Sequence, residues 1–159
     1  MYFYPVLGIL ISCYVLFLIW LFHESPTDFK VRDLKIPKKR FVMIVLQWCQ
    51  ENLETTKFRY DLKIYYYPNK KFGGKFQSFN KQIIIYIHPD LKLIDLTDII
   101  IHEYVHHIQF SMESTEQDYN KMLVKNGYWN NPFEVQARKL AQQHRKECLK
   151  WILSQNQLF

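Results

Sequence analysis

Glycine and cysteine are scarce in this chain, and each shortage excludes a class of site. The four glycines include one adjacent pair, at residues 73–74, so no glycine-rich loop of the kind that cradles a phosphate group is present. The three cysteines are an odd number, and their spacing matches no zinc site and no disulfide framework. The count still allows one disulfide bridge, but we expect Cys49 and Cys148 to be small buried hydrophobic residues.

Negative charge is also in short supply. The 159 residues contain 21 Lys and Arg against 15 Asp and Glu, which gives a formal net charge of +6. Such a balance is typical of adaptors that bind a membrane surface or nucleic acid. Here the lysines are spread along the chain and no nucleic-acid-binding motif or internal repeat is present, so we expect no nucleic-acid partner. The length suits one domain with a core and a short extra segment.

An apolar run of eighteen residues without a charge lies near the N-terminus, at residues 5–22. As a helix it would measure about 27 Å, enough to span a membrane. It lacks the basic start and the small-residue cleavage site of a signal peptide. We therefore predict a single-pass membrane protein with an anchor at 1–24, a linker at 25–36 and one folded domain at 37–159. The basic residues that follow the apolar run predict a cytoplasmic domain.

Within the folded domain, apolar periodicity and turn residues predict both helices and strands. A first helix is expected from Pro37 or Lys38 to about Leu53. Strands are expected at 61–67, 75–79 and 82–88, with a turn-rich connection at 69–74, and the last strand is too apolar for burial on one face only. Residues 111–120 are expected to be a loop or short helix, and a final helix is expected from Pro132 to about residue 155.

The most informative stretch is His102-Glu103-Tyr104-Val105-His106, which has the pattern H-E-x-x-H. Asp95 or Thr97 can cap a helix here, and apolar side chains recur at helical spacing. Residues four apart share one helix face, so both imidazoles can bind one metal ion. Glu103 lies beside that pair, where it can take a proton from a metal-bound water. His107 is turned about 100° out of the pattern and is not expected to be a ligand.

A zinc site with an open position needs a third protein ligand. The metzincin class is excluded, because Gln109 and Met112 stand where its Gly and His would be. Glu134 is the best-placed acid, since Asn131 as N-cap and Pro132 as first helical residue put it in the first turn of a helix. A role in capping that helix is the alternative. The other candidates are His144, which ranks second, and Glu113, Glu116, Asp118 and Glu147.

His102-Glu103-x-x-His106 followed by Glu134 on a later helix resembles the gluzincin-type zinc metallopeptidases, and residues 134–141 are weakly similar to the ImmA/IrrE-like branch. The resemblance implies an α+β, zincin-like fold in which a small antiparallel or mixed sheet packs on the H-E-x-x-H helix and further helices. It implies one Zn²⁺ held by His102, His106 and Glu134, and hydrolysis of peptide bonds with Glu103 as general base. It also implies an edge strand that holds a peptide or protein substrate in extended form.

Several alternatives stay open beside this prediction. Many gluzincins have an Asp four residues after the ligand Glu to orient a zinc-bound His, whereas this chain has Arg138 there. Tyr119 and Tyr128 are candidates for stabilising the oxyanion of the reaction. Manganese, cobalt or nickel could use the same ligand atoms as zinc. A metal-binding but catalytically inactive regulatory or immunity module is the alternative function.

Overall fold

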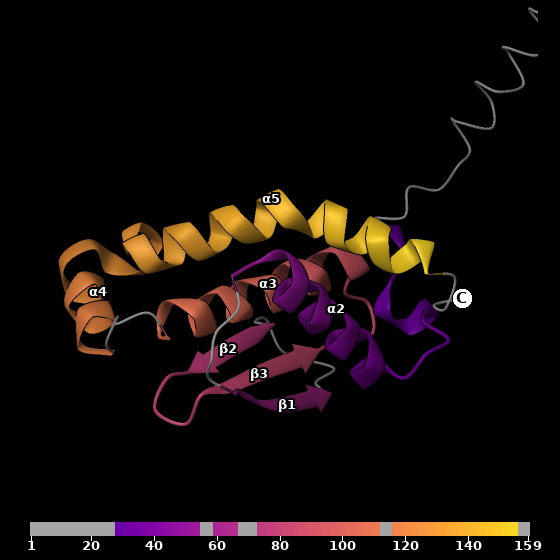
Figure 1. Ribbon diagram of the computed structural model, residues 1–159, viewed down its shortest axis with the longest axis horizontal. Coiled ribbons are helices and arrows are strands. Elements are labelled where there is room, and N and C mark those ends of the chain that lie inside the picture. The colour runs from indigo at the N-terminus through magenta and orange to yellow at the C-terminus, as the bar shows by residue number, and fades with distance from the viewer. Residues whose placement is uncertain (1–27, 55–58, 67–72, 112–115, 156–159) are drawn as a thin grey trace, which may run out of the picture.

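The computed structural model describes residues 28–54, 59–66, 73–111 and 116–155. In chain order these contain a short 3-10 helix η2 (Val31–Asp33), helix α2 (Lys38–Asn52), strands β1 (Asp61–Tyr66), β2 (Gly74–Gln77) and β3 (Gln82–Ile87), and helices α3 (Leu93–Gln109), α4 (Glu116–Asn130) and α5 (Pro132–Ser154). The sheet covers one side of α3, and α5 crosses over the opposite side (Figure 1). The described part of the chain is therefore α+β, with a small sheet and long helices, as predicted.

The membrane-spanning part of the fold prediction is corrected. Among the helices that the structure describes, none is both long and apolar enough to cross a bilayer. Helix α5, with 23 residues, has sufficient length but carries charged side chains along it. The anchor expected at residues 1–24 lies outside the described residues. Because no described helix can cross a bilayer, the structure does not support a transmembrane helix in the fold, and the predicted single-pass membrane localisation and cytoplasmic orientation are not supported either.

The sheet has the order β1-β3-β2, so β3 is central. Strand β1 runs parallel to β3, in register from Asp61↔Gln82 to Tyr66↔Ile87, and β2 runs antiparallel to it, from Gly74↔Ile85 to Gln77↔Gln82. All of β3 except Tyr86 is buried, in agreement with the prediction of a strand covered on both faces. Within the described residues, β2 is an edge strand, and it is the edge that contacts α3.

The adjacent glycines bring β2 close to α3. A Cβ atom on Gly74 would lie 2.7 Å from Cγ of Glu103, and one on Gly73 would lie 2.1 Å from Cδ1 of Ile99. Any side chain at these positions would have to displace a side chain of α3 or push the strand away. The glycine pair, expected only as part of a turn, thus sets the distance between the edge strand and the H-E-x-x-H helix.

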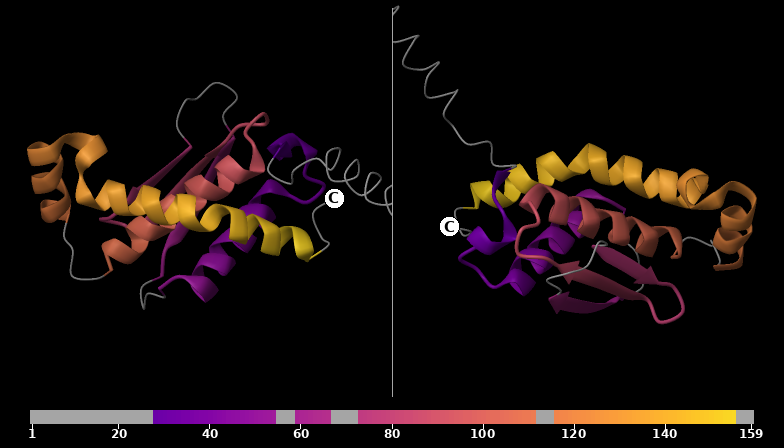
Figure 2. Two further views of the ribbon diagram at one scale, coloured as in Figure 1. Left: turned by 90° about the horizontal axis from the view of Figure 1, so that it is seen from above. Right: turned by 180° about the vertical axis from the view of Figure 1, so that it is seen from behind.

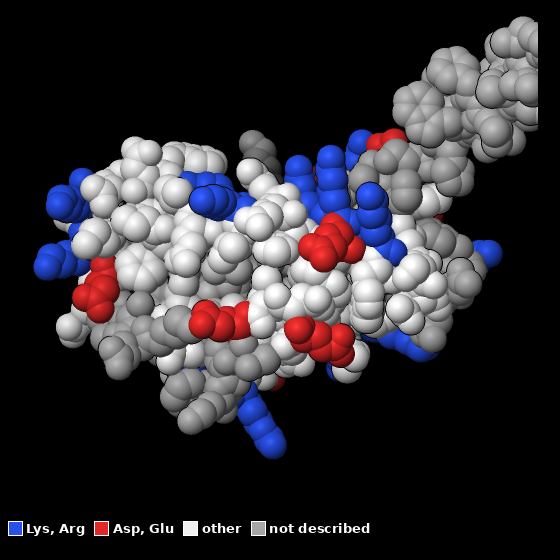
Figure 3. Space-filling view, turned by 45° about the horizontal axis from the view of Figure 1, so that its top comes forward, with Lys and Arg blue, Asp and Glu red and all other residues white. Residues whose placement is uncertain are grey.

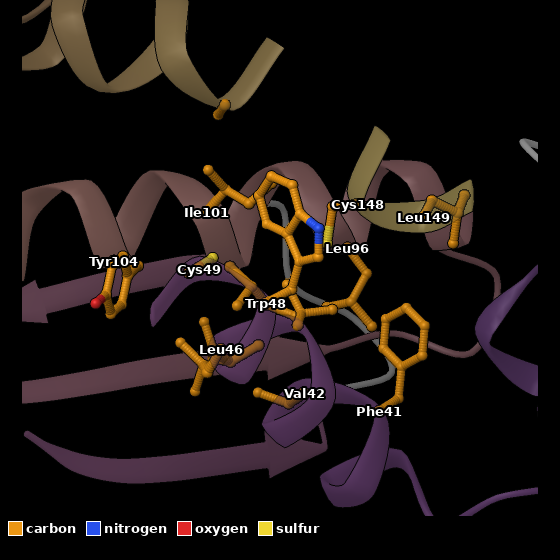
Figure 4. Close-up of a cluster of buried hydrophobic side chains, with 14 of the residues drawn as sticks. Phe41, Val42, Leu46, Trp48, Cys49, Leu96, Ile101, Tyr104, Cys148 and Leu149 are labelled. Carbon is orange, nitrogen blue, oxygen red and sulfur yellow. The ribbon is translucent and has the colours of Figure 1, made fainter. Parts of the chain in front are cut away.

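The hydrophobic core lies between α2, α3, α5 and the sheet. Trp48 of α2 is 2% exposed and lies in the centre of the cluster that Figure 4 shows. Ala137 and Ala141 of α5 are fully buried, and their small side chains let α5 lie against α3. Cys49 and Cys148 are buried free thiols, as predicted.

Two segments at the edges of the domain differ in how they pack. Val31, in the region expected to be a linker, is fully buried, and its backbone N–H donates to the carbonyl of Leu91 over 2.9 Å. Helix α4, in contrast, has no buried residue and stands at the N-terminal end of α5, away from the core (Figure 2). Gly127, with φ 71°, interrupts its helical backbone.

The positive charge is not gathered into one area on the face that carries α5. On that face, Lys and Arg side chains stand in separate groups with Asp and Glu between them (Figure 3). Opposite charges also pair across elements, since Nη1 of Arg145 in α5 and Oδ1 of Asp98 in α3 are 3.4 Å apart. The net charge of the chain is therefore partly compensated locally on this face.

Candidate metal centre

Helix α3 carries two of the three predicted ligands. His102 and His106 are one turn apart, and their Nε2 atoms are 3.1 Å from each other. The helix begins earlier than its expected caps. Its N-cap is Lys92, and the hydroxyl of Thr97 donates to the carbonyl of Leu93 inside the helix, over 2.8 Å. Asp95 lies in the first turn, where its charge favours the helix dipole.

Helix α5 supplies the third predicted ligand. Asn131 is the N-cap, as predicted, and its Oδ1 accepts a hydrogen bond from the backbone N–H of Phe133 over 3.1 Å. This start places Glu134 over the two histidines. Its Oε2 is 3.3 Å from Nε2 of His102, and its Oε1 is 3.3 Å from Nε2 of His106. The structure thus brings together the three residues that the sequence singled out.

The positions of these ligand atoms fit a metal ion of the size of zinc. Ligand atoms about 2.0–2.2 Å from a tetrahedral zinc ion lie about 3.3–3.6 Å from one another. Here the two imidazole Nε2 atoms are 3.1 Å apart and each lies 3.3 Å from a different carboxylate oxygen of Glu134, and one ligand atom from each residue lies within 4.8 Å of the other two. Oε2 of Glu134 is buried and accepts no hydrogen bond, which leaves a lone pair available to a cation. His102, His106 and Glu134 can therefore hold a metal ion.

The pKa values of two ligands shift in opposite directions. Burial raises the pKa of Glu134, but the nearby imidazoles of His102 and His106 and the hydrogen bond from Tyr119 lower it by more, so the net pKa is well below its ordinary value. Burial lowers the pKa of His106, but Glu134 and Glu103 outweigh it, so the net pKa is raised. Glu134 is therefore charged over the working pH range, as a metal ligand must be.

Glu103 lies beside the three ligands without joining them. It is 6% exposed, lines the cavity above the site and accepts a hydrogen bond from the backbone N–H of Phe76 in β2. Burial raises its pKa, while His106 and His102 lower it, and the net pKa is above the ordinary value. A carboxylate with a raised pKa accepts and returns protons near neutral pH more readily than an exposed one.

A cavity of about 300 Å³ opens above these groups. Strand β2 forms one wall through Gly74 and Phe76, and α4 forms the facing wall through Tyr119 and Tyr128. At one end the two walls are joined, because the hydroxyl of Ser78 donates to a carboxylate oxygen of Glu116 at the start of α4, over 2.7 Å. The three candidate ligands thus lie at the base of an open cleft whose walls are formed by β2 and α4.

The two tyrosines of the cleft both interact with Glu134, but Tyr128 is more exposed than Tyr119. The hydroxyl of Tyr119 donates to Oε1 of Glu134 over 2.8 Å, so it holds a ligand carboxylate instead of facing the cleft freely. Tyr128 is 47% exposed, and burial, the charge of Glu134 and a hydrogen bond with the Glu134 carboxylate raise its pKa to about 12. A hydroxyl with such a pKa stays protonated and can act as a hydrogen-bond donor.

The remaining sequence candidates lie away from the three ligands. His107 is 1% exposed and packs among aromatic rings, with its ring centre 5.2 Å from that of Tyr60, so it belongs to the core, as expected for a residue outside the pattern. His144 packs on Trp48, and its Nδ1 is 3.5 Å from a carboxylate oxygen of Glu147. Of the other acids, Glu116 accepts from Ser78, Asp118 is not part of the ligand group, and Glu113 lies outside the described residues.

Comparisons of the chain with protein-family models, with curated proteins and with solved structures gave no match in any of the three. The resemblance to gluzincin-type metallopeptidases therefore depends on the residues of this chain alone.

Two further residues, Arg138 and Gln109, contact the candidate ligands, and the sequence pattern predicted a role at the site for neither of them. Arg138, where many gluzincins have an Asp, places its Nη1 3.8 Å from Oε2 of Glu134 and its guanidinium 5.2 Å from the ring centre of Trp129. Gln109 is 7% exposed, and its Oε1 lies 2.8 Å from Nδ1 of His106. Its position three residues after His106 on the same helix is the sequence signal that could have identified it.

Proposed function

We propose that this protein is a zinc-dependent metallopeptidase in which His102, His106 and Glu134 hold the ion and Glu103 is the general base. The observation that carries the proposal is the group of three candidate ligands with the buried carboxylate of Glu103 beside it at an open cavity. A structural zinc site normally has four protein ligands, whereas three ligands and an adjoining cavity are typical of a catalytic one.

Glu103 favours an enzyme over an inactive metal-binding module. A metal-binding module needs the three ligands, but it does not need a fourth ionisable group buried next to them. Burial of Glu103 raises its pKa, which means that the folded protein holds its charged form at a cost in stability. Such a cost is typical of groups that are retained for catalysis.

The reaction follows from the positions of these groups. When bound, the zinc ion supplies a Lewis acid that acidifies a water molecule and polarises the peptide carbonyl. The Glu103 carboxylate accepts the proton of the water as the water oxygen attacks the carbonyl carbon. When the C–N bond breaks, Glu103 returns the proton to the leaving amine. The Tyr128 hydroxyl, on the wall of the cleft, donates to the developing oxyanion and contributes about 2–4 kcal/mol when it is preorganised.

Strand β2 is the segment that would hold the substrate. The carbonyl of Gly73 accepts from Tyr86 of β3, whereas the N–H of Phe76 points to Glu103. In an antiparallel strand the direction of these groups alternates, so the backbone of Gly74 and Phe76 faces the cleft. Among the described residues no further strand pairs with this edge, so an extended peptide can pair with it by β-augmentation, which binds the backbone and tolerates different side chains.

The test uses the full-length protein, with zinc content measured by mass spectrometry and hydrolysis measured on unfolded casein and on a mixture of peptides. Glu103→Gln is expected to keep one zinc per chain and to lower kcat by about 10²–10⁴-fold, because it removes only the proton acceptor. Glu147→Gln, which changes an exposed acid of α5, is the matched control and is expected to change neither quantity.

The outcomes separate the two functions. Cleavage by the wild type that persists at full rate in Glu103→Gln would contradict the assigned base. A wild type that binds one zinc ion and cleaves none of the substrates would contradict the peptidase and would favour the inactive metal-binding module.

A further inference from the structure

We propose that Gln109 is a positioning residue that fixes the tautomer and the orientation of His106 for metal binding. The proposal depends on the metal-binding role of His106 in the proposed function, but it does not depend on peptide hydrolysis. Gln109 is the last residue of α3 and is 7% exposed, so its amide group must find its hydrogen-bond partners inside the protein.

All three partners of the Gln109 amide are present. Its Nε2 is 3.0 Å from the carbonyl oxygen of Phe133 and 3.0 Å from Oε1 of Gln136, both in the first turns of α5. Its Oε1 is 2.8 Å from Nδ1 of His106. The amide therefore connects a ligand on α3 with the start of the helix that carries the ligand Glu134.

These contacts determine which ring nitrogen of His106 carries a proton. A backbone carbonyl only accepts hydrogen bonds, so the group of Gln109 that faces Phe133 must be the amino group. The amide oxygen then faces His106, and because it only accepts, Nδ1 of the imidazole must be the donor. A neutral imidazole with its proton on Nδ1 has its lone pair on Nε2, the atom that lies 3.3 Å from Glu134 and faces the metal position.

The same contacts restrict the rotation of the ring. His106 is held from one side by Gln109, at Nδ1, and it packs edge-on against Tyr119, with ring centres 6.3 Å apart. Partners of this kind raise the basicity of a ligand imidazole and remove its freedom to turn away from the ion. In this chain, a glutamine within the metal-binding helix thus has the orienting role that the Asp absent at position 138 would otherwise have.

The experiment compares zinc-loaded variants by two measurements that do not involve hydrolysis. The first is the zinc dissociation constant, from competition with a chelator. The second is the NMR signal of the Nδ1 proton of His106, which a hydrogen bond shifts downfield and protects from exchange. Gln109→Leu is expected to weaken zinc binding by about 10–100-fold and to lose the protected signal, because it removes the acceptor.

Gln109→Glu separates positioning from packing. It keeps an acceptor for Nδ1 but removes the donor to Phe133, so it is expected to retain the protected proton and to bind zinc at least ten times more tightly than Gln109→Leu. Gln47→Leu, which removes an amide that is hydrogen-bonded to Glu51 on α2, is the matched control and is expected to leave both measurements unchanged.

The proposal is overturned if Gln109→Leu folds and keeps the protected proton with a dissociation constant within twofold of the wild type. If Gln109→Leu does not fold, Gln109→Glu decides, and loss of the protected proton in a folded Gln109→Glu overturns the proposal. Either result leaves the peptidase standing when the wild type binds zinc and cleaves peptides. A wild type that binds no zinc overturns both.

Discussion

The helices that carry the three candidate ligands and the helix that forms a wall of the cleft, α4, are built in different ways. Helix α3 is buried along most of its length and packs against α2, the sheet and α5, whereas α4 has no buried residue. All three metal ligands lie on α3 and α5, and the facing tyrosines lie on α4. The positions of the candidate ligands are thus fixed by the core of the domain, whereas α4 is attached through residues that are only half-buried or exposed, such as Tyr119, whose ring centre lies 5.8 Å from that of Phe133.

The strongest contrast is expected between an acid of the ligand-bearing helices and an acid of α4. Glu134→Ala removes a ligand and is expected to lower zinc affinity by about 10³-fold or more, because two histidines alone make an incomplete site. Glu116→Ala, on α4, removes only the contact with Ser78 and is expected to leave affinity within about threefold of the wild type. Chelator competition measures both, and equal losses in the two variants would contradict the distinction.

The loss of kcat on removing a side-chain group of α4 is expected to be smaller than the loss of zinc affinity in Glu134→Ala. Tyr128→Phe removes the hydroxyl that we assign to oxyanion stabilisation, and we expect kcat to fall by about 10²–10³-fold while zinc content stays at one ion per chain. Steady-state kinetics with zinc analysis provides the measurement. Unchanged kcat would exclude Tyr128 and would leave the oxyanion donor to be found on another element.

Substitutions in the ligand-bearing helices should also lower the free energy of unfolding more than substitutions in α4 do. Ala141→Leu adds a larger side chain where α5 lies on α3, and it is expected to lower the free energy of unfolding by about 1–3 kcal/mol. Val124→Ala, on the exposed surface of α4, is expected to change it by less than about 0.5 kcal/mol. Urea denaturation followed by circular dichroism tests both, and a larger loss in Val124→Ala would show that α4 belongs to the core.

The smallest effect concerns pH in metal-free protein. The lowered pKa of Glu134 contributes stability above its ordinary value of 4.5, and this is lost as the pH falls through the lowered pKa. The raised pKa of His106 contributes stability below its ordinary value of 6.5, and this is lost as the pH rises through the raised pKa. Their joint contribution is therefore greatest between pH 4.5 and 6.5. Glu134→Gln should reduce stability there by about 1 kcal/mol, and urea denaturation at several pH values would reveal a flat difference if the pair contributes nothing.

The sequence predicted the parts of the site that local spacing determines. The four-residue spacing of His102 and His106 sets one helix face, and Asn131 with Pro132 sets the start of α5 and hence the place of Glu134. The three strands and the burial of β3 were likewise predicted from local sequence patterns.

Other features depend on contacts between distant segments, which spacing does not reveal. The approach of Gly74 to Glu103 and the hydrogen bond from Phe76 require the tertiary arrangement of β2 on α3. The contact of Gln109 with Phe133 likewise joins two helices. The membrane anchor was predicted from the apolar composition and the length of one segment, and these two properties do not determine whether a segment lies in a membrane.

The two ends of the ligand set lie far apart in the chain, with α4 between His106 and Glu134. An ion bound to both would act as a crosslink that closes the loop of residues 107–133, and a covalent link across a loop of that length stabilises a fold by about 3–4 kcal/mol. Loss of the ion would then lower the stability of the whole fold and, under the proposed function, end hydrolysis in the same step. In such a chain the supply of metal would govern how much protein survives as well as how fast it works.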